Sequence, residues 1–509
     1  MKEKFNDKIS ENEIEKWKNG DKVILNGGTG TGKTLFTMTR LASYVKAKTN
    51  KTIKISDRKK ILYVCNRTKL EDDVELDILK FNNSDVIDVT TYQSIQQNII
   101  RKIPIKEYDY YVFDEIHYFI SDAAFNKHTD ISYQFAISRK NSISIFMSAT
   151  ADELFTKIKT NSEKYYEYKI EKDYSYVEKM YFLHGKDCMK SKIVDIMNTT
   201  NDKIIYFCNS SDNAFNLHKE LSDKSNFYCS KSNKYKKYSQ PDCIKKYKIG
   251  EIDNITFEKQ LLITTVALDN GINLVDRNIK HILCDVFDTD KLIQCFGRKR
   301  IIDDTDTCNF YLKKYSNREI SGFEKNINDN LKPAKLFRKD IKEFNIKYVN
   351  NRNFPQNIIY PEVDENGKEY FKLNELQYAK GIIDLANIRR MKEIGYKKFI
   401  YSKFGTTLKR TNVIDAEVEE QNCKQLELKE YLDSIVGEVM LKLPDRRNLI
   451  EKLNIRSDGK LLKKKQSLNA ALEELNLPFR VTEFETSRII DGKKKNFKSA
   501  WKVQRLTED

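Results

Sequence analysis

The chain has 509 residues, of which 39% are hydrophobic and 33% charged, a length that suits about three globular domains with cores of their own. The longest apolar runs are strand-sized and the start, MKEKFNDK, leads into polar sequence, so we expect a cytoplasmic protein with neither a transmembrane helix nor a secretory signal. Nine cysteines lack the paired C-x-x-C spacing of zinc sites, which predicts reduced thiols and neither zinc nor a disulfide. A net charge of +16 suits a polyanionic partner such as nucleic acid, although a general bias toward Lys, Asn, Ile and Tyr would also raise it.

A glycine-rich loop follows the first predicted strand. Residues 22–25 (KVIL) are apolar, residues 27–34 read GGTGTGKT, and residues 35–44 have helical spacing. In the pattern G-x-x-x-x-G-K-[ST], backbone N–H groups and the positive end of the helix face phosphate oxygens. Lys33 would reach the β- and γ-phosphates of ATP, and Thr34 would ligate Mg²⁺. The residues predicted to bind the nucleotide in this loop are Gly27, Gly30, Gly32, Lys33 and Thr34.

Two adjacent carboxylates end a later strand. Residues 110–117 read YYVFDEIH, which places Asp114 and Glu115 at the C-terminal end of an apolar run, where an open α/β sheet binds its ligands. Asp114 would hold Mg²⁺ through water, and Glu115 would orient and deprotonate the attacking water. A surface acidic pair is the alternative, but the nearby phosphate loop favours the catalytic interpretation.

Strand-like runs form two successive series, which indicates two α/β units with mostly parallel sheets. The first series comprises 22–25, 61–64, 86–89, 110–113 and 142–147, and the second comprises 203–208, 226–229, 260–264, 281–286 and 308–312. The charged, Tyr-rich stretch 156–178 follows the first series, so we place one domain at 1–155 and the next at 156–316. The second series has no phosphate loop, which suggests that this unit closes on nucleotide held by the first.

Across about residues 15–315, the order of these segments resembles a superfamily 2 helicase of the DEAD/DEAH-like group, with paired RecA-like domains of the P-loop NTPase fold. GGTGTGKT is similar to motif I of that family, and DEIH to motif II. The other matches are VCNRTKL (64–70, motif Ia), VTTYQSI (89–95, the phosphate-contacting segment), MSAT (147–150, motif III), YFCNSSD (206–212, motif IV), TVALDNGIN (265–273, motif V) and QCFGRKR (294–300, motif VI). Each is weak alone, but their collinear order favours the family, including its phage and mobile-element members.

The resemblance implies roles for residues of the second domain. Arg298 would be an arginine finger that reaches the γ-phosphate when the domains close, and Gln294 would contact the γ-phosphate or the attacking water. The family's second arginine falls at Ile301 here, so Arg300 is the candidate for that role. Gly271 would lie near the ribose.

The resemblance also implies coupling residues. Ser148 and Thr150 would link the nucleotide site to nucleic-acid binding, and His117 would connect that site to the second domain through Gln294. A His after a strand is also often simply packed. Residues 1–26 contain no clear adenine-reading motif with a glutamine, so we expect loose base selectivity with ATP as the default nucleotide.

Nucleic-acid contacts in the family go mostly to the backbone. The residues at matching positions are Arg67, Thr91, Asn209 and Thr265, each of which could equally cap a helix or anchor a loop. By analogy with DEAH-like replication and repair helicases, we favour DNA over RNA.

We therefore predict an ATP-dependent motor that moves along nucleic acid. The alternative is an ATP-regulated binding switch or a replication-origin-binding protein without processive unwinding. A strand-separating hairpin in the second domain would favour the motor, and the polar stretch 232–259 is the roomy insertion where one would fit.

The last third of the chain lies beyond the resemblance. Residues 317–440 are predicted as a mainly helical accessory region, with helices at 372–395 and 421–441 and a polar turn at 361–368. Residues 441–509 carry 17 Lys and Arg against 10 Asp and Glu. Two predicted helices (446–453 and 467–475) and a hairpin (479–489 and 497–504) resemble a winged-helix module. Lys493, Lys494 and Lys495 would lie at its tip, and Trp501 would either stack on a base or fill the core.

Overall fold

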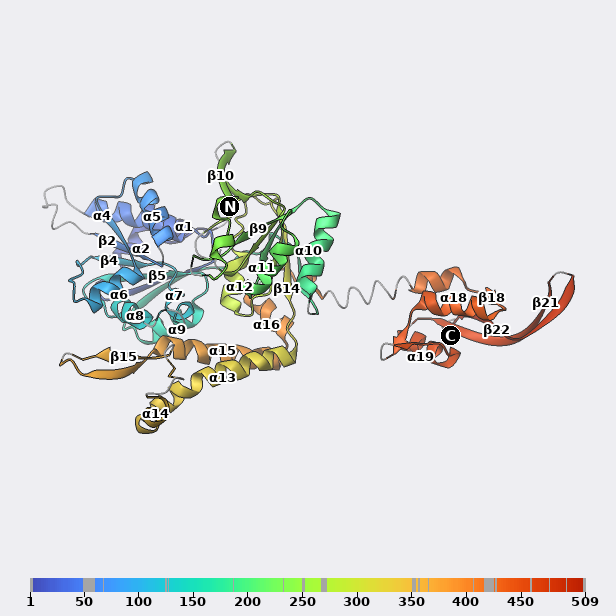
Figure 1. Cartoon of the computed structure of the whole chain (residues 1–509). Helices are drawn as coiled ribbons and strands as arrows, with labels where there is room; N and C mark the ends of the chain where they lie inside the picture. The colour runs from blue at the N-terminus through green and yellow to red at the C-terminus, as the bar shows by residue number, and fades with distance from the viewer. Residues whose placement is uncertain are drawn as a thin grey trace. The chain divides into compact units, whose positions relative to one another are not determined.

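The computed structural model describes residues 3–48, 60–66, 68–123, 126, 128–185, 187–231, 233–249, 252–266, 272–349, 354–355, 358–364, 366–405, 407–415, 425, 428–457, 460–475, 477–490 and 492–506. The chain divides into two compact units, Met1–Ile414 and Asp415–Asp509. The first unit contains two large sheets and a helical segment, and the second contains a small three-stranded sheet with helices (Figure 1). Within these ranges, no helix is long and apolar enough to cross a membrane.

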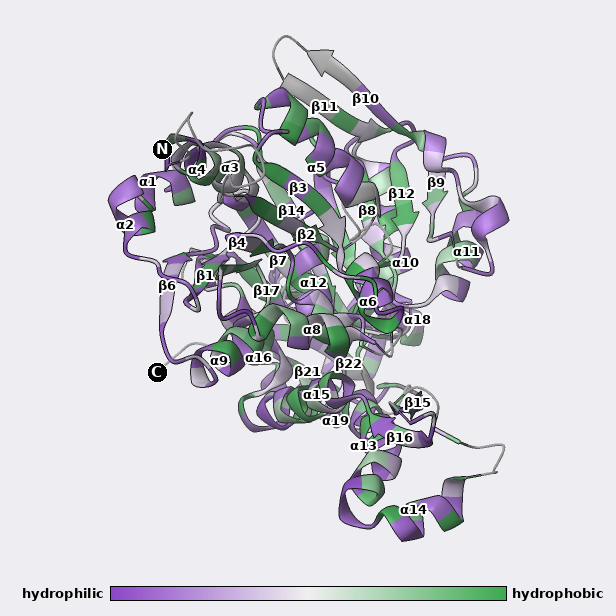
Figure 2. Cartoon of the chain, turned by 90° about the vertical axis from the view of Figure 1, so that its left-hand side faces the viewer, coloured by the Kyte–Doolittle hydropathy of each residue, from purple (hydrophilic) through white to green (hydrophobic). Residues whose placement is uncertain are grey.

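Six parallel strands form the first sheet, in the order β3-β2-β4-β5-β1-β6. The strands are β1 (Lys22–Gly27), β2 (Ile61–Cys65), β3 (Ile87–Thr91), β4 (Tyr110–Phe113), β5 (Ile143–Ser148) and β6 (Tyr165–Ile170). Val23 and Leu25 pack into one apolar cluster and Ile24 into another, because successive side chains point to opposite faces. Burial on both faces explains the nearly continuous apolar sequence of β2 (Figure 2).

Helices cover both faces of this sheet. The helix that follows the phosphate loop runs through α3 (Lys33–Phe36), a π-helical segment η1 (Thr37–Leu41) and α4 (Ala42–Lys48). The others are α1 (Phe5–Lys8), α2 (Glu11–Glu15), α5 (Thr68–Lys80), α6 (Tyr92–Ile100), α7 (Tyr118–Ser121), α8 (Thr129–Ile137) and α9 (Asp152–Thr160).

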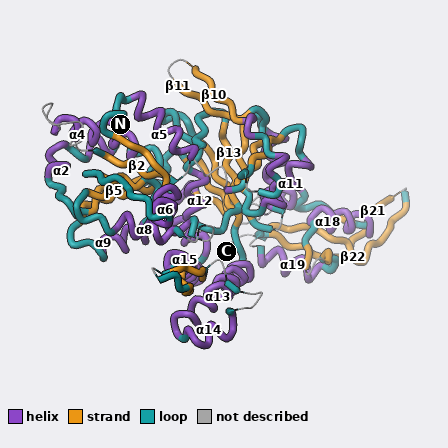
Figure 3. The backbone as a smooth tube through the Cα atoms, turned by 60° about the vertical axis from the view of Figure 1, so that its left-hand side comes forward, coloured by secondary structure: helices purple, strands orange, loops and turns teal. Residues whose placement is uncertain are grey.

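The second sheet has the order β17-β7-β14-β13-β8-β12-β9, and the six strands from β7 to β9 are parallel. Its strands are β7 (Val177–Leu183), β8 (Lys203–Phe207), β9 (Ser225–Tyr228), β12 (Leu261–Thr264), β13 (Ile279–Cys284), β14 (Cys308–Lys313) and β17 (Val413–Asp415). Its helices are α10 (Cys188–Thr199), α11 (Ser211–Glu220) and α12 (Thr289–Phe296). Figure 3 shows helices around the strands of both sheets. The two predicted parallel-sheet units are therefore confirmed.

The stretch 156–178 holds strands that the sequence pattern did not predict. β6 pairs with β1, so the first sheet extends beyond residue 155, where the first domain was predicted to end. β7 begins at Val177 and pairs with β14 of the second sheet. β6 is an edge strand of which only Tyr168 and Ile170 are buried, so its Tyr-rich, charged sequence lacks the apolar signature of the central strands.

A β-hairpin interrupts the second sheet between β9 and β12. It is formed by β10 (Ile244–Ile249) and β11 (Ile252–Phe257), which pair antiparallel. Two short 3₁₀ turns, η3 (Lys236–Tyr238) and η4 (Pro241–Cys243), precede it. Figures 1 and 3 show the hairpin standing out from the sheet, within the insertion 232–259.

The accessory segment after the second sheet is mainly helical, as predicted. Its elements are α13 (Asn317–Lys339), α14 (Ile341–Tyr348), β15 (Ile359–Val363), β16 (Glu369–Leu373), α15 (Glu375–Ile394), α16 (Tyr396–Lys403) and η6 (Arg410–Asn412). The predicted turn at 361–368 joins β15 to β16 in a hairpin, and the helix predicted at 372–395 is α15.

The second unit has its own apolar core. Residues 428–434 are helical, followed by β18 (Val439–Met440), α18 (Leu443–Leu453), β19 (Arg456–Ser457), β20 (Lys460–Leu461), α19 (Lys465–Glu474), β21 (Phe479–Ile490) and β22 (Lys493–Arg505). Its larger sheet has the order β18-β22-β21. Trp501 is 7% exposed within the core, with the Arg446 guanidinium 5.7 Å from its ring centroid. Trp501 is thus a core residue, the second of the two predicted alternatives.

Candidate functional site

The phosphate-binding loop connects β1 to α3. Gly30 and Gly32 adopt φ angles of +84° and +79°, which glycine reaches without the strain that a side chain would cause. Lys33 Nζ donates hydrogen bonds to the carbonyl oxygens of Gly27 (2.8 Å) and Gly28 (3.0 Å). Burial lowers the pKa of Lys33, whereas the charges of Glu115 and Asp114 raise it. The ammonium group therefore lies inside the loop, next to the acidic pair.

The N-terminal helix α1 covers this loop, which the sequence did not predict. The Phe5 backbone N–H donates to the carbonyl oxygen of Thr31 (3.1 Å). The Phe5 side chain is fully buried, and a Cβ placed on Gly27 would lie 2.9 Å from its ring. An apolar residue in an otherwise polar and Lys-rich start is the sequence signal for this contact.

Asp114 and Glu115 follow β4 and adopt different environments. Asp114 Oδ1 accepts from the Glu115 N–H (2.9 Å), and the Tyr92 hydroxyl donates to the Asp114 carbonyl oxygen (2.8 Å). Burial and the charge of Glu115 raise the pKa of Asp114 to about 6. Burial also raises the pKa of Glu115, but the hydrogen bond from His117 and the charges of His117, Lys33 and Arg298 lower it to about 2. Glu115 is thus ionised at neutral pH and able to accept a proton from water.

Tyr63 of β2 is a site residue that the sequence analysis missed. Its hydroxyl donates to Asp114 Oδ2 (2.6 Å). Burial raises the pKa of Tyr63, whereas Thr34 lies close enough to lower it. Tyr63 therefore lies beside both side chains predicted to hold Mg²⁺. A hydroxyl-bearing residue near the end of an apolar strand is a faint signal, because its partners lie on other elements of the fold.

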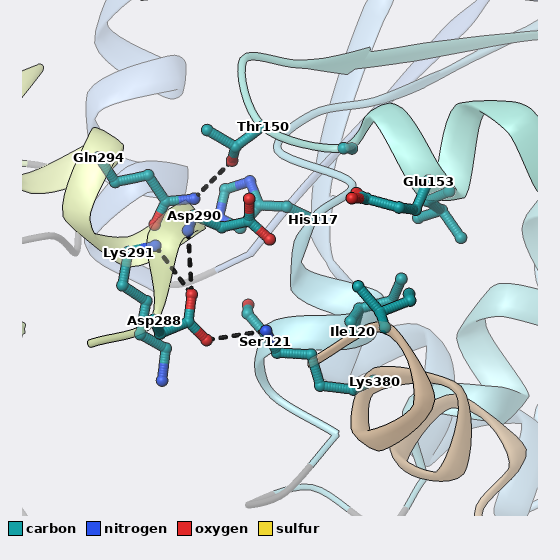
Figure 4. Close-up of a pocket in the computed structure, with 13 residues that line it drawn as sticks. His117, Ile120, Ser121, Thr150, Glu153, Asp288, Asp290, Lys291, Gln294 and Lys380 are labelled. Carbon is teal, nitrogen blue, oxygen red and sulfur yellow. Dashed lines mark hydrogen bonds and ion pairs between the residues drawn. The ribbon is translucent and has the colours of Figure 1, made fainter. Parts of the chain in front are cut away.

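Hydrogen bonds connect Glu115 to the second sheet. His117 Nδ1 lies 3.2 Å from both Glu115 Oε2 and Ser148 Oγ. Ser148 Oγ accepts from the Thr150 N–H (3.2 Å), and Gln294 Nε2 of α12 donates to Thr150 Oγ1 (2.8 Å). Figure 4 shows Gln294, Thr150 and His117 around one pocket. The structure thus brings the predicted coupling residues together, and Thr150 provides the link to Gln294.

The segment after α12 brings both arginine candidates to the phosphate loop. A Cβ placed on Gly297 would lie only 3.0 Å from Thr29 Oγ1, so the two sheets approach each other closely here. Arg298 is 7% exposed, and its charge lowers the pKa of Glu115. Burial and the charge of Arg298 lower the pKa of Arg300 to about 10, while the charge of Glu115 raises it. Positive charge from the second sheet therefore acts on the nucleotide site of the first.

Comparison with known protein families finds a match over the segment that carries the phosphate loop and the acidic pair. Residues 7–158 match the family model described as DEAD/DEAH box helicase. This segment is a DEAD/DEAH box helicase domain. No curated protein matches the chain.

Solved structures similar to the chain include Dbp5 of S. cerevisiae bound to RNA and ADP BeF3, and a variant of Dbp5 bound to the same molecules. The two structures are 14% and 15% identical to this chain, with TM-scores of 0.42 and 0.41. Each similarity covers 60% of this chain and 82% of the other.

The helicase domain has a donor set that fits ATP with Mg²⁺. The Asp114 carboxylate and the Thr34 hydroxyl are the hard oxygen ligands that Mg²⁺ prefers, and Tyr63 donates a hydrogen bond to Asp114. Lys33 Nζ lies inside the loop on two of its backbone carbonyl oxygens, where it would meet the phosphates of a bound nucleotide. Gly271, expected near the ribose, lies outside the described residues.

The predicted nucleic-acid residues follow the C-terminal ends of strands. Thr91 caps α6, because its hydroxyl accepts a hydrogen bond from the Ser94 N–H (3.1 Å). In this structure Thr91 therefore acts as the helix cap that the sequence offered as an alternative role. Asn209 follows β8 with an exposed side chain, and its N–H donates to Asp285 Oδ1 (2.6 Å). Thr265 directly follows β12 and is partly exposed. Arg67 lies outside the described residues.

Proposed function

We propose that the chain is an ATP-dependent helicase or translocase that acts on DNA. The observation that carries the proposal is the meeting of Gln294, Gly297 and Arg298 with the phosphate loop and acidic pair of the first sheet. A nucleotide held by the first sheet would be enclosed by the second. Such a composite site makes hydrolysis depend on the arrangement of the two domains.

The residues divide the work of phosphoryl transfer among them. Lys33 and the loop N–H groups bind the phosphates, while Thr34 and Asp114 hold Mg²⁺, which supplies positive charge to the phosphate oxygens. Glu115 orients the attacking water and accepts its proton. Arg298, supported by Arg300, stabilises the negative charge that develops on the transferred phosphoryl group. Because both arginines come from the second sheet, separation of the sheets would stop hydrolysis.

The coupling route begins at Glu115. It passes through His117 and Ser148 to Thr150, and from there to Gln294 on α12. The strand ends that carry Thr91, Asn209 and Thr265 would contact the backbone of the nucleic acid, so a shift of the strand would move both sheets.

The hairpin β10-β11 supports the motor over the switch. It projects from the second sheet, in the insertion that has room for a strand-separating element (Figure 1). Its base carries Lys245 and Lys246, whose side chains suit contact with phosphates.

The second unit has features that suit binding to duplex nucleic acid. It contains three helices, 428–434, α18 and α19, with β18 between the first two and a β21-β22 hairpin at the end. This order of elements fits a winged-helix module. Lys493, Lys494 and Lys495 are exposed at the start of β22, directly after the turn. This basic turn would contact the phosphates of a nucleic-acid backbone. The same unit would serve a replication-origin-binding protein, which remains the second candidate function.

A strand-displacement assay tests the proposal. Fluorescent duplexes of DNA and of RNA, each with a single-stranded tail, are incubated with the full chain and either ATP or a non-hydrolysable analogue. We expect displacement of DNA with ATP alone. Displacement of RNA only would change the substrate, and nucleotide-dependent binding without any displacement would favour the binding switch.

A further inference from the structure

Helix α15 of the accessory segment packs first against the helicase domain. Leu376, in its first turn, belongs to the apolar cluster on one face of the first sheet. Asn374, the cap of α15, donates through Nδ2 to the carbonyl oxygen of Ala123 (3.1 Å). The preceding hairpin adds a hydrogen bond from the Tyr360 hydroxyl to Asp130 Oδ2 (2.9 Å). The start of α15 is therefore anchored to the first sheet.

The same helix ends in the core of the second sheet. Ile388 and Met391 belong to the apolar cluster that also contains Phe296 of α12. Because α15 is one continuous helix from Glu375 to Ile394, it connects both sheets as a single rigid element. Figure 1 shows α15 below both lobes, beside α13.

The segment after α15 reaches the linker between the sheets. Thr407 Oγ1 donates to the carbonyl oxygen of Lys172 (3.0 Å) and accepts from the Tyr174 N–H (2.9 Å). A Cβ placed on Gly28 would lie 3.3 Å from Cγ of Lys172, so the linker in turn covers the phosphate loop. The accessory segment thus contacts both sheets and their connection.

Lys380 connects the middle of α15 to α12. Its Nζ lies 2.8 Å from Asp288 Oδ2 (Figure 4). It also lies 2.7 Å from Asp384 Oδ1. Asp288 is the cap of α12, where Oδ1 accepts from the N–H groups of Asp290 (3.0 Å) and Lys291 (3.2 Å). Both partners are mostly buried, with the side chains of Lys380 and Asp288 16% and 23% exposed. Removal of one partner would leave a poorly solvated charge on the other.

We propose that Lys380 is a positioning residue for ATP hydrolysis, which holds the cap of α12 so that Gln294 stays on Thr150 and Arg298 stays at the nucleotide. The inference rests on the proposed function, because it assigns the accessory segment the role of a brace for the same composite site. Lys380 touches neither nucleotide nor reacting atoms. Its effect passes through Asp288 and the helix that Asp288 caps.

The test compares the full chain with Lys380→Met, Lys380→Arg and the control Lys392→Met. Lys392 lies on the same helix, but its ion pair with Glu324 (2.6 Å) leads to α13 and not to α12. We expect Lys380→Met to lower kcat for ATP by about tenfold or more, with a change in ATP affinity below about threefold, since misplaced groups slow the chemical step. Lys380→Arg should restore much of kcat, and Lys392→Met should match the unmodified chain.

Hydrogen exchange of the α12 amides gives a readout that does not depend on hydrolysis. Without ATP, Lys380→Met should speed exchange in a peptide that covers residues 289–296, and Lys392→Met should leave it unchanged. Unchanged kcat and unchanged α12 exchange in Lys380→Met would overturn the inference. An unmodified chain that hydrolyses no ATP would refute the proposed function, while the exchange data would still decide the α15–α12 contact.

If Lys380→Met fails to fold, Asp288→Asn replaces it. Asn is also a good helix cap, so this variant keeps the cap and removes the charge that Lys380 neutralises. A fall in kcat of about threefold or more, with retained ATP affinity, supports the inference. An unchanged kcat contradicts it.

Discussion

Tyr63 sets the environment of the predicted Mg²⁺ ligands. Replacement by Phe keeps the ring in the sheet but removes the hydrogen bond to Asp114 and the hydroxyl beside Thr34. We expect Tyr63→Phe to raise the Mg²⁺ concentration needed for half-maximal ATP hydrolysis by about tenfold, as is usual for residues that orient metal ligands. Binding of Mn²⁺ with ADP, measured by electron paramagnetic resonance, should weaken in parallel.

Tyr110→Phe is the matched control for Tyr63→Phe. Tyr110 is buried in the same apolar cluster as Tyr63, but it is the first residue of β4 and lies at the end of that strand opposite Asp114. It should leave the Mg²⁺ dependence unchanged. If both variants need the same Mg²⁺ concentration for half-maximal ATP hydrolysis, Tyr63 does not orient the metal ligands.

Arg298 and Arg300 are the two candidates for the arginine finger. Arg298→Ala should lower kcat by at least about 100-fold with little change in ATP affinity, since a finger acts mainly in the transition state. Arg300 lies close enough to Arg298 and Glu115 for their charges to affect its pKa, so Arg300→Ala should cause a smaller loss. Rapid-quench measurements of a single turnover would compare them. A larger loss in Arg300→Ala would reverse the assignment.

At the scale of single residues, local patterns predicted the motifs but not their supporting contacts. GGTGTGKT and DEIH could be interpreted because their chemistry requires fixed neighbours along the chain. Tyr63, Phe5 and Lys380 lie on segments without a local motif and reach the site only through tertiary packing. A single sequence holds no record of such proximity.

At the scale of elements, burial decided what could be predicted. Central strands such as β2 and β5 are buried along their whole length and showed clear apolar runs. The edge strand β6 lacks that run, so the stretch around it was interpreted as a separator. The sequence of hairpin β10-β11 also lacks a continuous apolar run, and only the size of the insertion indicated it.

The hairpin can be shortened without disturbing its base. Lys246 pairs with Ile255, so replacement of residues 247–254 by Asn-Gly leaves a two-residue turn on the remaining strands. Ile255 also keeps its backbone bonds to Val275. We expect DNA-stimulated ATP hydrolysis within about twofold of the unmodified chain and loss of strand displacement, because hydrolysis and strand separation use different surfaces. Normal displacement would exclude the hairpin as the separating element.

The basic turn of the second unit should contribute to duplex affinity. We expect DNA duplex binding at low salt to weaken by about tenfold or more when Lys493, Lys494 and Lys495 are all replaced by Glu. The difference in affinity from the unmodified chain should shrink as the salt concentration rises. Fluorescence anisotropy over a salt series would measure it. The control is a second triple variant, in which the exposed residues Lys325, Lys332 and Lys335 of α13 are replaced by Glu. Equal losses in both variants would indicate a general charge effect.

At the scale of the whole molecule, two parallel sheets and one nucleotide motif predicted a composite site. The structure adds the accessory segment, which no sequence pattern assigned. Its helix α15 shares apolar clusters with both sheets, so the two sheets and the accessory segment belong to one unit that ends at Ile414. The second unit has an apolar core of its own.

The central claim is that nucleic acid stimulates ATP hydrolysis in the cleft between the sheets. Steady-state hydrolysis, measured with no polymer, single-stranded DNA, duplex DNA or RNA, tests it most directly beside Glu115→Gln. We expect DNA to raise the rate of the full chain by about tenfold or more, and the Glu115→Gln variant to lose that rate. Rapid hydrolysis that is indifferent to every polymer, or unaffected by Glu115→Gln, would contradict the account.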